Sequence, residues 1–218
     1  MKVFPLFIVT LLGASLLTGQ EVDPMLVAVK ERADSIVSFQ AHVQMEVDIS
    51  FVNMPVKEAE IRFKKGSPIS ISSEDFVMIP KRGLDFTLNE LYKYPFMTLS
   101  LGKVQLEGRN CHLIKIIPTT DASDYSIASV WIAPETLQVL KTQISTKKNG
   151  VYDIFYNYSG KREILPSKIK VAFEVSGVKI PLRFLGRDTQ IDKGKKEESS
   201  QERGAIFLAI MYSDLTRL

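Results

Sequence analysis

Strict alternation of apolar and polar side chains constrains the fold of this chain more than any other feature of its sequence. In the segment 43–51, every second residue is apolar: Val43, Met45, Val47, Ile49 and Phe51. A period of two places successive side chains on opposite faces of a β-strand. The same period returns in segments 59–64 and 169–175. The chain is therefore predicted to be built mainly from half-buried strands.

Turn residues divide the chain into short apolar segments at regular intervals. Gly66-Ser67-Pro68, Gly108-Arg109-Asn110, Ala133-Pro134-Glu135 and Asn149-Gly150 are four such turns. Besides 43–51, we expect strands at 58–64, from 69, at 76–80, 97–106, 111–117, 126–133, 137–147, 151–158, 167–176 and 205–212. Many short strands with turn signals between them predict an antiparallel sheet, a barrel or a half-barrel.

Two segments have a helical pattern instead. Asp23 can cap a helix that begins at Pro24, and apolar residues then recur every three to four positions. We expect one amphipathic helix over 24–40. Thr87 and Glu90 have the spacing of a capping box, which predicts a short helix in 87–94. A long amphipathic helix must cover an apolar surface, and the face of the sheet is its natural partner.

The N-terminus indicates export. Lys2 is followed by an apolar run from Val3 to Leu17, the pattern of a secretory signal peptide. This run is about 15 residues long, short of the roughly 20 needed to span a bilayer. Gln20 stands where a lipid-anchored protein would need a cysteine. We expect residues 1–19 to be a cleaved signal peptide and residues 20–218 to form a single domain.

Three further features of the chain bear on its fold and function. The segment 186–204 is almost wholly polar, so we expect a mobile loop there. Cys111 is the only cysteine, so the fold contains no internal disulfide. The formal net charge is +3 and falls by one when Lys2 is removed with the signal peptide. Such a balance argues against a nucleic-acid binder, which needs a clustered basic face.

Catalytic and metal-binding motifs are absent from the sequence. The two histidines, His42 and His112, are far apart, whereas a zinc site needs three or four ligands. No G-x-S-x-G elbow and no phosphate-binding glycine loop occurs. His112 and Cys111 are neighbours on one strand, so their side chains point to opposite faces. We therefore expect no enzyme, no catalytic residues, no metal and no cofactor.

Large apolar side chains occur on nearly every predicted element. Flat aromatics and flexible methionines suit irregular apolar ligands. They also serve ordinary core packing, and for a single residue the sequence leaves both interpretations open. A sheet of about ten strands covered by one helix offers more apolar face than that helix can cover. The large apolar side chains concerned are Phe51, Phe63, Phe76, Met78, Phe86, Phe96, Met97, Trp131, Phe155, Phe173 and Phe184.

The order of motifs resembles a known family. A signal peptide precedes "IVSFQAHVQMEV", "EAEIRFKKGSPISI", "GRNCHLIKIIP", "ASVWIAPETLQVLK" and "LPSKIKVAF". This series is similar to the LolA-like periplasmic outer-membrane lipoprotein-sorting carriers, over essentially the whole mature chain. Gly66-Ser67-Pro68 stands where the best-known carriers have Arg-Pro-Gly, and Ala133 replaces a usual acidic residue. The chain therefore resembles a divergent member, and the family's lid-latch role is not carried over.

The resemblance implies a mainly β (α+β) fold: a highly curved antiparallel sheet, an unclosed half-barrel covered by the N-terminal helix and a short helical lid. It implies a soluble periplasmic carrier of the acyl chains of lipoproteins or lipids, a monomer without a cofactor. Envelope proteins of the inner and outer membranes are candidate partners. The residues we expect to line the cavity are Phe63, Ile71, Phe76, Met78, Trp131 and Phe155. A lipoprotein sensor and a structural envelope protein with a filled core remain the alternatives.

Overall fold

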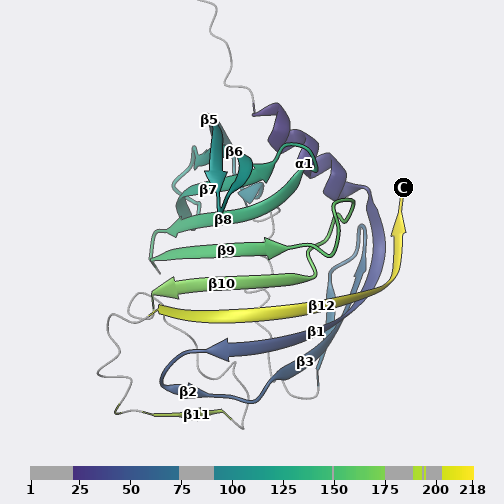
Figure 1. Cartoon of the computed structure of the whole chain (residues 1–218), viewed down its shortest axis with the longest axis vertical. Coiled ribbons are helices and arrows are strands. Elements are labelled where there is room, and N and C mark those ends of the chain that lie inside the picture. Colours follow the sequence, from purple (N-terminus) through teal and green to yellow (C-terminus); the bar gives the residue numbers. More distant parts are fainter. Residues whose placement is uncertain (1–21, 74–90, 149, 175–188, 193, 195–202) are drawn as a thin grey trace, which may run out of the picture.

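A computed structural model describes residues 22–73, 91–148, 150–174, 189–192, 194 and 203–218. Ten strands form one antiparallel sheet, and a helix lies beside it (Figure 1). Across the view, neighbouring strands follow one another in the order β8, β9, β10, β12, β1 and β3. The strand β5 stands almost upright against them, so the sheet is strongly twisted and curved.

Helix α1 (Pro24–Asp34) begins at the cap that the sequence predicts. The Asp23 carboxylate accepts a hydrogen bond from the Met25 backbone N–H at 2.9 Å, and Pro24 occupies the first turn. The predicted length of the helix is wrong, because the helix ends at Asp34 and strand β1 starts at Ile36. Residues 36–40 pair with other strands instead, which satisfies their backbone groups along the ladder.

The remaining elements are strands, and most agree with the predicted ranges to within two residues. They are β1 (Ile36–Asp48), β2 (Val52–Asn53), β3 (Lys57–Lys64), β4 (Ser70–Ser72), β5 (Phe96–Leu106), β6 (Arg109–Pro118), β7 (Tyr125–Ala133), β8 (Gln138–Thr146), β9 (Val151–Asn157), β10 (Lys168–Glu174), β11 (Gln190–Ile191) and β12 (Arg203–Arg217). The closing strand is longer than the predicted 205–212. Strands β2 and β11 form a separate two-stranded ribbon.

The sheet is open. Its strand order is β4-β3-β1-β12-β10-β9-β8-β7-β6-β5, and every neighbouring pair is antiparallel. Among the described residues, the end strands β4 and β5 do not pair with each other. Of the three architectures that the strand pattern allows, the structure is therefore the unclosed half-barrel, as the family resemblance implies.

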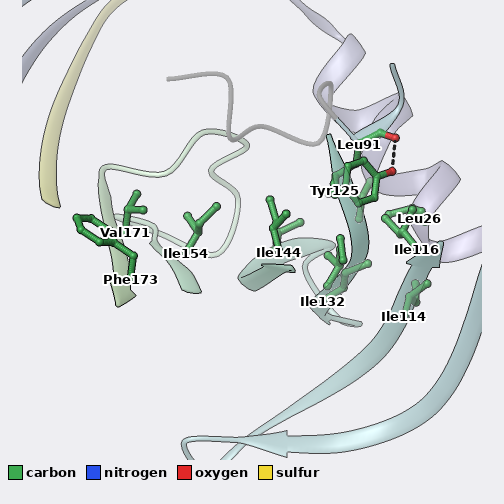
Figure 2. Packing of buried hydrophobic residues seen from close by; sticks show 14 of the residues in the cluster. Leu26, Leu91, Ile114, Ile116, Tyr125, Ile132, Ile144, Ile154, Val171 and Phe173 are labelled. Carbon is green, nitrogen blue, oxygen red and sulfur yellow. Dashed lines mark hydrogen bonds between the residues drawn. The ribbon is translucent and has the colours of Figure 1, made fainter. Parts of the chain in front are cut away.

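The core lies on one face of this sheet, which we call the inner face. Ile132, Ile144, Ile154 and Val171 come from four neighbouring strands and point to the same side (Figure 2). Leu26 of α1 lies over Ile116 on that side, so the helix covers part of the inner face. Alternate residues of each strand point to the opposite, outer face.

Several sequence predictions fall outside the described residues. These are the signal peptide at 1–19, the strand at 76–80, the first part of the helix at 87–94 and most of the polar loop at 186–204. Of the predicted short helix, Leu91 is helical and residues 92–93 form a turn.

Candidate binding site

The inner face has two parts that differ in burial. The covered part lies next to α1 on strands β6 to β9, where Ile114, Ile116, Val130, Ile132 and Ile154 are 0% exposed. Leu26 of α1 is also 0% exposed and packs in the same cluster. The covered part is therefore a close-packed core.

The open part lies on strands β12, β1, β3 and β4. The register places Phe63 opposite Phe39, and Ile61 opposite both Ala41 and Ile71. Phe39, Phe63, Ile61 and Ile71 are half-buried, unlike the isoleucines of the covered part. On the same strands Ala41, Val43, Ala59 and Leu208 are buried, so this part of the face is apolar and is reached by solvent only in places.

Three aromatic rings gather in the open part. Phe39 stacks on Phe63 with the ring centroids 5.2 Å apart, and Tyr212 meets Phe39 edge-on at 5.3 Å. The Tyr212 hydroxyl donates a hydrogen bond to the Pro166 carbonyl at 3.0 Å. Both ring arrangements are favourable aromatic geometries. The cluster is thus an ordered apolar surface, held at one side by a hydrogen bond.

The dimensions limit how much of the inner face α1 by itself can cover. An α-helix of 11 residues is about 16 Å long. Ten strands spaced at about 4.8 Å form a sheet about 43 Å wide. Among the described residues, α1 is the only helix of more than one residue. It therefore spans the width of only three to four strands.

The structure separates the six residues that the sequence predicts as cavity lining. Phe63 and Ile71 lie on the inner face, in the open part. Trp131 and Phe155 alternate with the buried Ile132 and Ile154, so their side chains lie on the outer face. Phe76 and Met78 lie outside the described residues. A lipid contact for any of the six stays a prediction.

From the sequence we missed two residues of the open part, Phe39 and Tyr212, and one buried residue of the same face, Lys57. Phe39 was assigned to the helix and Tyr212 to the end of the last strand, so neither was proposed as lining. Lys57 is 1% exposed and lies opposite Met45 on the inner face. Lys57 is thus a buried residue of the same face, and its position in the alternating series Lys57, Ala59, Ile61 was the available signal, because residues two apart share a face.

Polar contacts attach the N-terminus of α1 to the sheet. The Asp23 backbone N–H donates to the Thr98 hydroxyl at 2.9 Å, and the Asp23 carboxylate lies 3.6 Å from Nε2 of His112. The Ser100 hydroxyl lies 2.8 Å from the same nitrogen. A catalytic triad needs serine and aspartate on different imidazole nitrogens. The arrangement therefore anchors the helix and lacks the geometry of a hydrolase.

Arg32 attaches the other end of α1 to two loops. Its guanidinium donates hydrogen bonds to the carbonyls of Thr136, Arg162 and Glu163. These carbonyls lie just before β8 and between β9 and β10. The helix is thus held at both ends over the covered part.

The tyrosines of the inner face are uncharged near neutral pH. Burial raises the pKa of Tyr125 and of Tyr156 to about 12, and it also raises the pKa of Tyr152 and Tyr212. Tyr125 donates a hydrogen bond to the Leu91 carbonyl at 3.0 Å, which Figure 2 shows. These hydroxyls therefore stay protonated well above neutral pH, and they place no phenolate charge on the inner face.

No helix in the described part of the chain is long and apolar enough to cross a membrane. No protein-family model and no curated protein matches the sequence.

Solved structures with a similar overall arrangement exist. A LolA superfamily protein from Nitrosomonas europaea is 13% identical, with a TM-score of 0.48 over 88% of this chain and 93% of that one. A DUF1329 family protein from Desulfovibrio piger is 12% identical, with a TM-score of 0.44 over 91% and 94% of the two chains. A domain assigned to the outer membrane lipoprotein-sorting proteins of Vibrio parahaemolyticus is 10% identical, with a TM-score of 0.41 over 87% and 92%.

These values are too low to transfer a residue role or an activity to this chain. The observed architecture nevertheless agrees with the fold that the sequence motifs predict. An open ten-stranded antiparallel sheet, with a helix against part of its inner face, is the unclosed half-barrel expected from those motifs.

Proposed function

We propose that this protein binds the acyl chains of lipoproteins or lipids on the open part of its inner face and carries them across the periplasm, without catalysing a reaction. The proposal includes export by the predicted signal peptide and action as a monomer. Phe63 and Ile71 are proposed as ligand contacts, together with Phe39 and Tyr212.

One observation carries this proposal: the helix covers only part of a wide apolar face. The residues next to α1 are fully buried, whereas Phe39, Phe63 and Ile71 are half-buried. Apolar surface that stays in contact with water provides a driving force for binding an apolar ligand. An acyl chain is long, flexible and uncharged, and it matches a curved strip of aromatic and aliphatic side chains.

The expected affinity follows from the area of the ligand. Burying about 14 methylene groups at roughly 0.8 kcal/mol each gives a gross gain near 11 kcal/mol. Association and ordering cost at least about 4 kcal/mol. The remaining free energy of up to about 7 kcal/mol corresponds to a Kd from about 10 μM upwards for a single chain. Ligands with two or three chains are expected to bind more tightly.

The test measures binding of a peptide acylated with one 16-carbon chain. Phe63→Ala and Tyr212→Ala are expected to weaken its affinity by about tenfold each, the value of a partly buried aromatic contact. Arg62→Ala is the matched control, because Arg62 neighbours Phe63 on the strand but lies on the outer face. Native mass spectrometry of the protein purified from a Gram-negative periplasm should also detect co-purified lipid.

The predicted contacts on other elements are tested in the same assay. Ile71→Ala should weaken acyl-chain binding, and Phe76→Ala and Met78→Ala test the two positions outside the described residues. Trp131→Ala and Phe155→Ala ask whether the outer face contributes. Wild-type protein that binds neither the acylated peptide nor the free fatty acid would refute the proposal.

A further inference from the structure

The outer face has an ordered row of aromatic and basic side chains. Trp131, Lys141, Phe155, Lys170 and Phe207 are successive register partners on β7, β8, β9, β10 and β12. The Lys141 ammonium lies 5.1 Å from the Trp131 ring centroid and 4.9 Å from that of Phe155. The Lys170 ammonium lies 5.3 Å from the Phe207 ring centroid. Each distance is that of a cation–π contact.

The two lysines of this row differ in their anionic partners. Lys141 forms an ion pair with Asp153 at 2.8 Å. In the described part of the chain, Lys170 has no ion pair with a carboxylate, and its side chain is exposed. Lys141 is therefore a structural cation, whereas the charge of Lys170 is available to a ligand.

A pocket of about 230 Å³ adjoins Lys170 and Phe155. Its other walls include Leu140 of β8 and Leu106 and Arg109 of the β5–β6 hairpin. Like Lys170, Arg109 has no ion pair among the described residues. Two cations from distant parts of the sequence thus line one small pocket, whose walls combine polar residues with Leu106, Leu140 and Phe155.

The hairpin turn holds Arg109 in place. Glu107 and Gly108 have φ angles of 49° and 78°, so both central residues of this two-residue turn are left-handed. Such a turn matches the twist of the flanking strands and fixes their register. Glu107 also lines the pocket, which leaves two cations against one carboxylate.

We propose that this pocket binds the phosphate group of a small organic phosphate, either free or as the headgroup of a lipid. A guanidinium offers two parallel donors to a phosphate, and an ammonium adds a point charge. The volume lies below the 300–1,000 Å³ of pockets for drug-sized ligands, which suits a group of headgroup size. Leu106, Leu140 and Phe155 would contact the carbon atoms of that group.

This site is separate from the proposed acyl-chain site, because Lys170 and Phe155 lie on the outer face. Acyl-chain binding and phosphate binding can therefore succeed or fail independently.

The test uses sn-glycerol 1-phosphate in isothermal titration calorimetry with the full mature chain. Arg109→Gln and Lys170→Gln are each expected to weaken binding about tenfold or more, because each removes a charge-assisted hydrogen bond. Glu107→Gln is expected to tighten binding severalfold, because it removes the one carboxylate of the pocket. Lys64→Gln is the matched control, since Lys64 is an exposed lysine on the outer face of β3.

Vesicles distinguish the two sources of the phosphate. If lipid is the source, phosphatidylglycerol vesicles bind the protein, phosphatidylcholine vesicles bind it less, and glycerol phosphate competes. If the source is a free organic phosphate, glycerol phosphate binds and neither vesicle does. The proposal is overturned if the wild type binds neither probe saturably. It is also overturned if Lys64→Gln weakens binding as much as Lys170→Gln does, because a general charge effect would then explain the result.

Discussion

In the covered part of the inner face, Ile132 and Ile154 are 0% exposed, whereas Phe39 and Phe63 in the open part are half-buried. Both parts belong to the same sheet and have the same alternation. Leu26 and Val29 of α1 pack in the core cluster with the covered part, whereas in the open part the small or central side chains Ala41, Val43 and Leu208 are buried and the rings are not. One continuous apolar face thus combines a close-packed core beside α1 with a candidate binding surface around Phe39 and Phe63.

The largest effect is expected from shortening one isoleucine in each part. Ile154→Ala should lower the free energy of unfolding by about 2–5 kcal/mol, because it leaves a cavity in a close-packed core. Ile61→Ala in the open part should cost no more than about 1.5 kcal/mol, because solvent already reaches that side chain. Urea unfolding monitored by circular dichroism measures both. Equal losses would show that the two parts are packed alike and would break the comparison.

Removing the anchor of the helix is expected to have the next largest effect. Arg32→Met loses hydrogen bonds to the carbonyls of Thr136, Arg162 and Glu163, and should cost about 1–3 kcal/mol. Hydrogen exchange of the α1 amides should accelerate in this variant, while exchange in β1 and β3 stays unchanged. Arg62→Met, on the exposed face of β3, serves as the control. Unchanged exchange in α1 would mean that its apolar contacts alone hold the helix.

A hydroxyl in the covered part gives a smaller effect with a defined pH dependence. Tyr125→Phe removes the hydrogen bond to the Leu91 carbonyl and should cost about 1 kcal/mol near neutral pH. The pKa of Tyr125 is raised to about 12, above its ordinary value of 10, because burial disfavours the phenolate. Its contribution is therefore complete below pH 10 and is lost as the pH rises towards 12.

Unfolding curves from pH 9 to about 11.5 test this sign. The wild type should lose more stability over this range than Tyr125→Phe does. A parallel decline of the two proteins would indicate that Tyr125 ionises as readily in the folded chain as in the unfolded one.

The smallest effect concerns the outer side of the open part. The Glu60 carboxylate, 2.7 Å from Nδ1 of His42, raises the pKa of His42 above its usual 6.5. Glu58, 3.7 Å from Nε2, acts in the same direction. The contribution of His42 is thus fully present below pH 6.5 and is lost as the pH rises through the raised pKa.

Comparing the wild type with His42→Gln at about pH 5.5 and pH 8.5 tests this effect. The stability difference should be larger at the lower pH, and should shrink in high salt because the pair is exposed. A difference that grows with pH would contradict the assigned sign.

Local patterns in the sequence predicted most strands well. The predicted strand at 151–158 is observed as Val151–Asn157, and the predicted 126–133 is observed as Tyr125–Ala133. Alternation and turn residues are local signals, and they suffice for strands that pair with a sequence neighbour, such as β8 with β9.

Prediction failed where distant parts of the chain decide the structure. Residues 36–40 fit a helix by their spacing, yet they join β1, because β12 and β3 pair with them from both sides. The residues predicted to line the cavity lie on both faces of the sheet for a similar reason. Phe63 and Trp131 both belong to alternating strands, but alternation does not say which of its two faces a helix will cover.

The sequence by itself determined most of the strands, the start of α1 at Asp23-Pro24 and the absence of an internal disulfide. These properties depend on the period of the apolar residues, on capping chemistry and on a single cysteine. Only the tertiary structure decided that β1 lies between β3 and β12, and that Phe63 shares a face with α1 while Trp131 does not. Strand order and the choice of inner face depend on contacts between residues far apart in the chain, which no local pattern encodes.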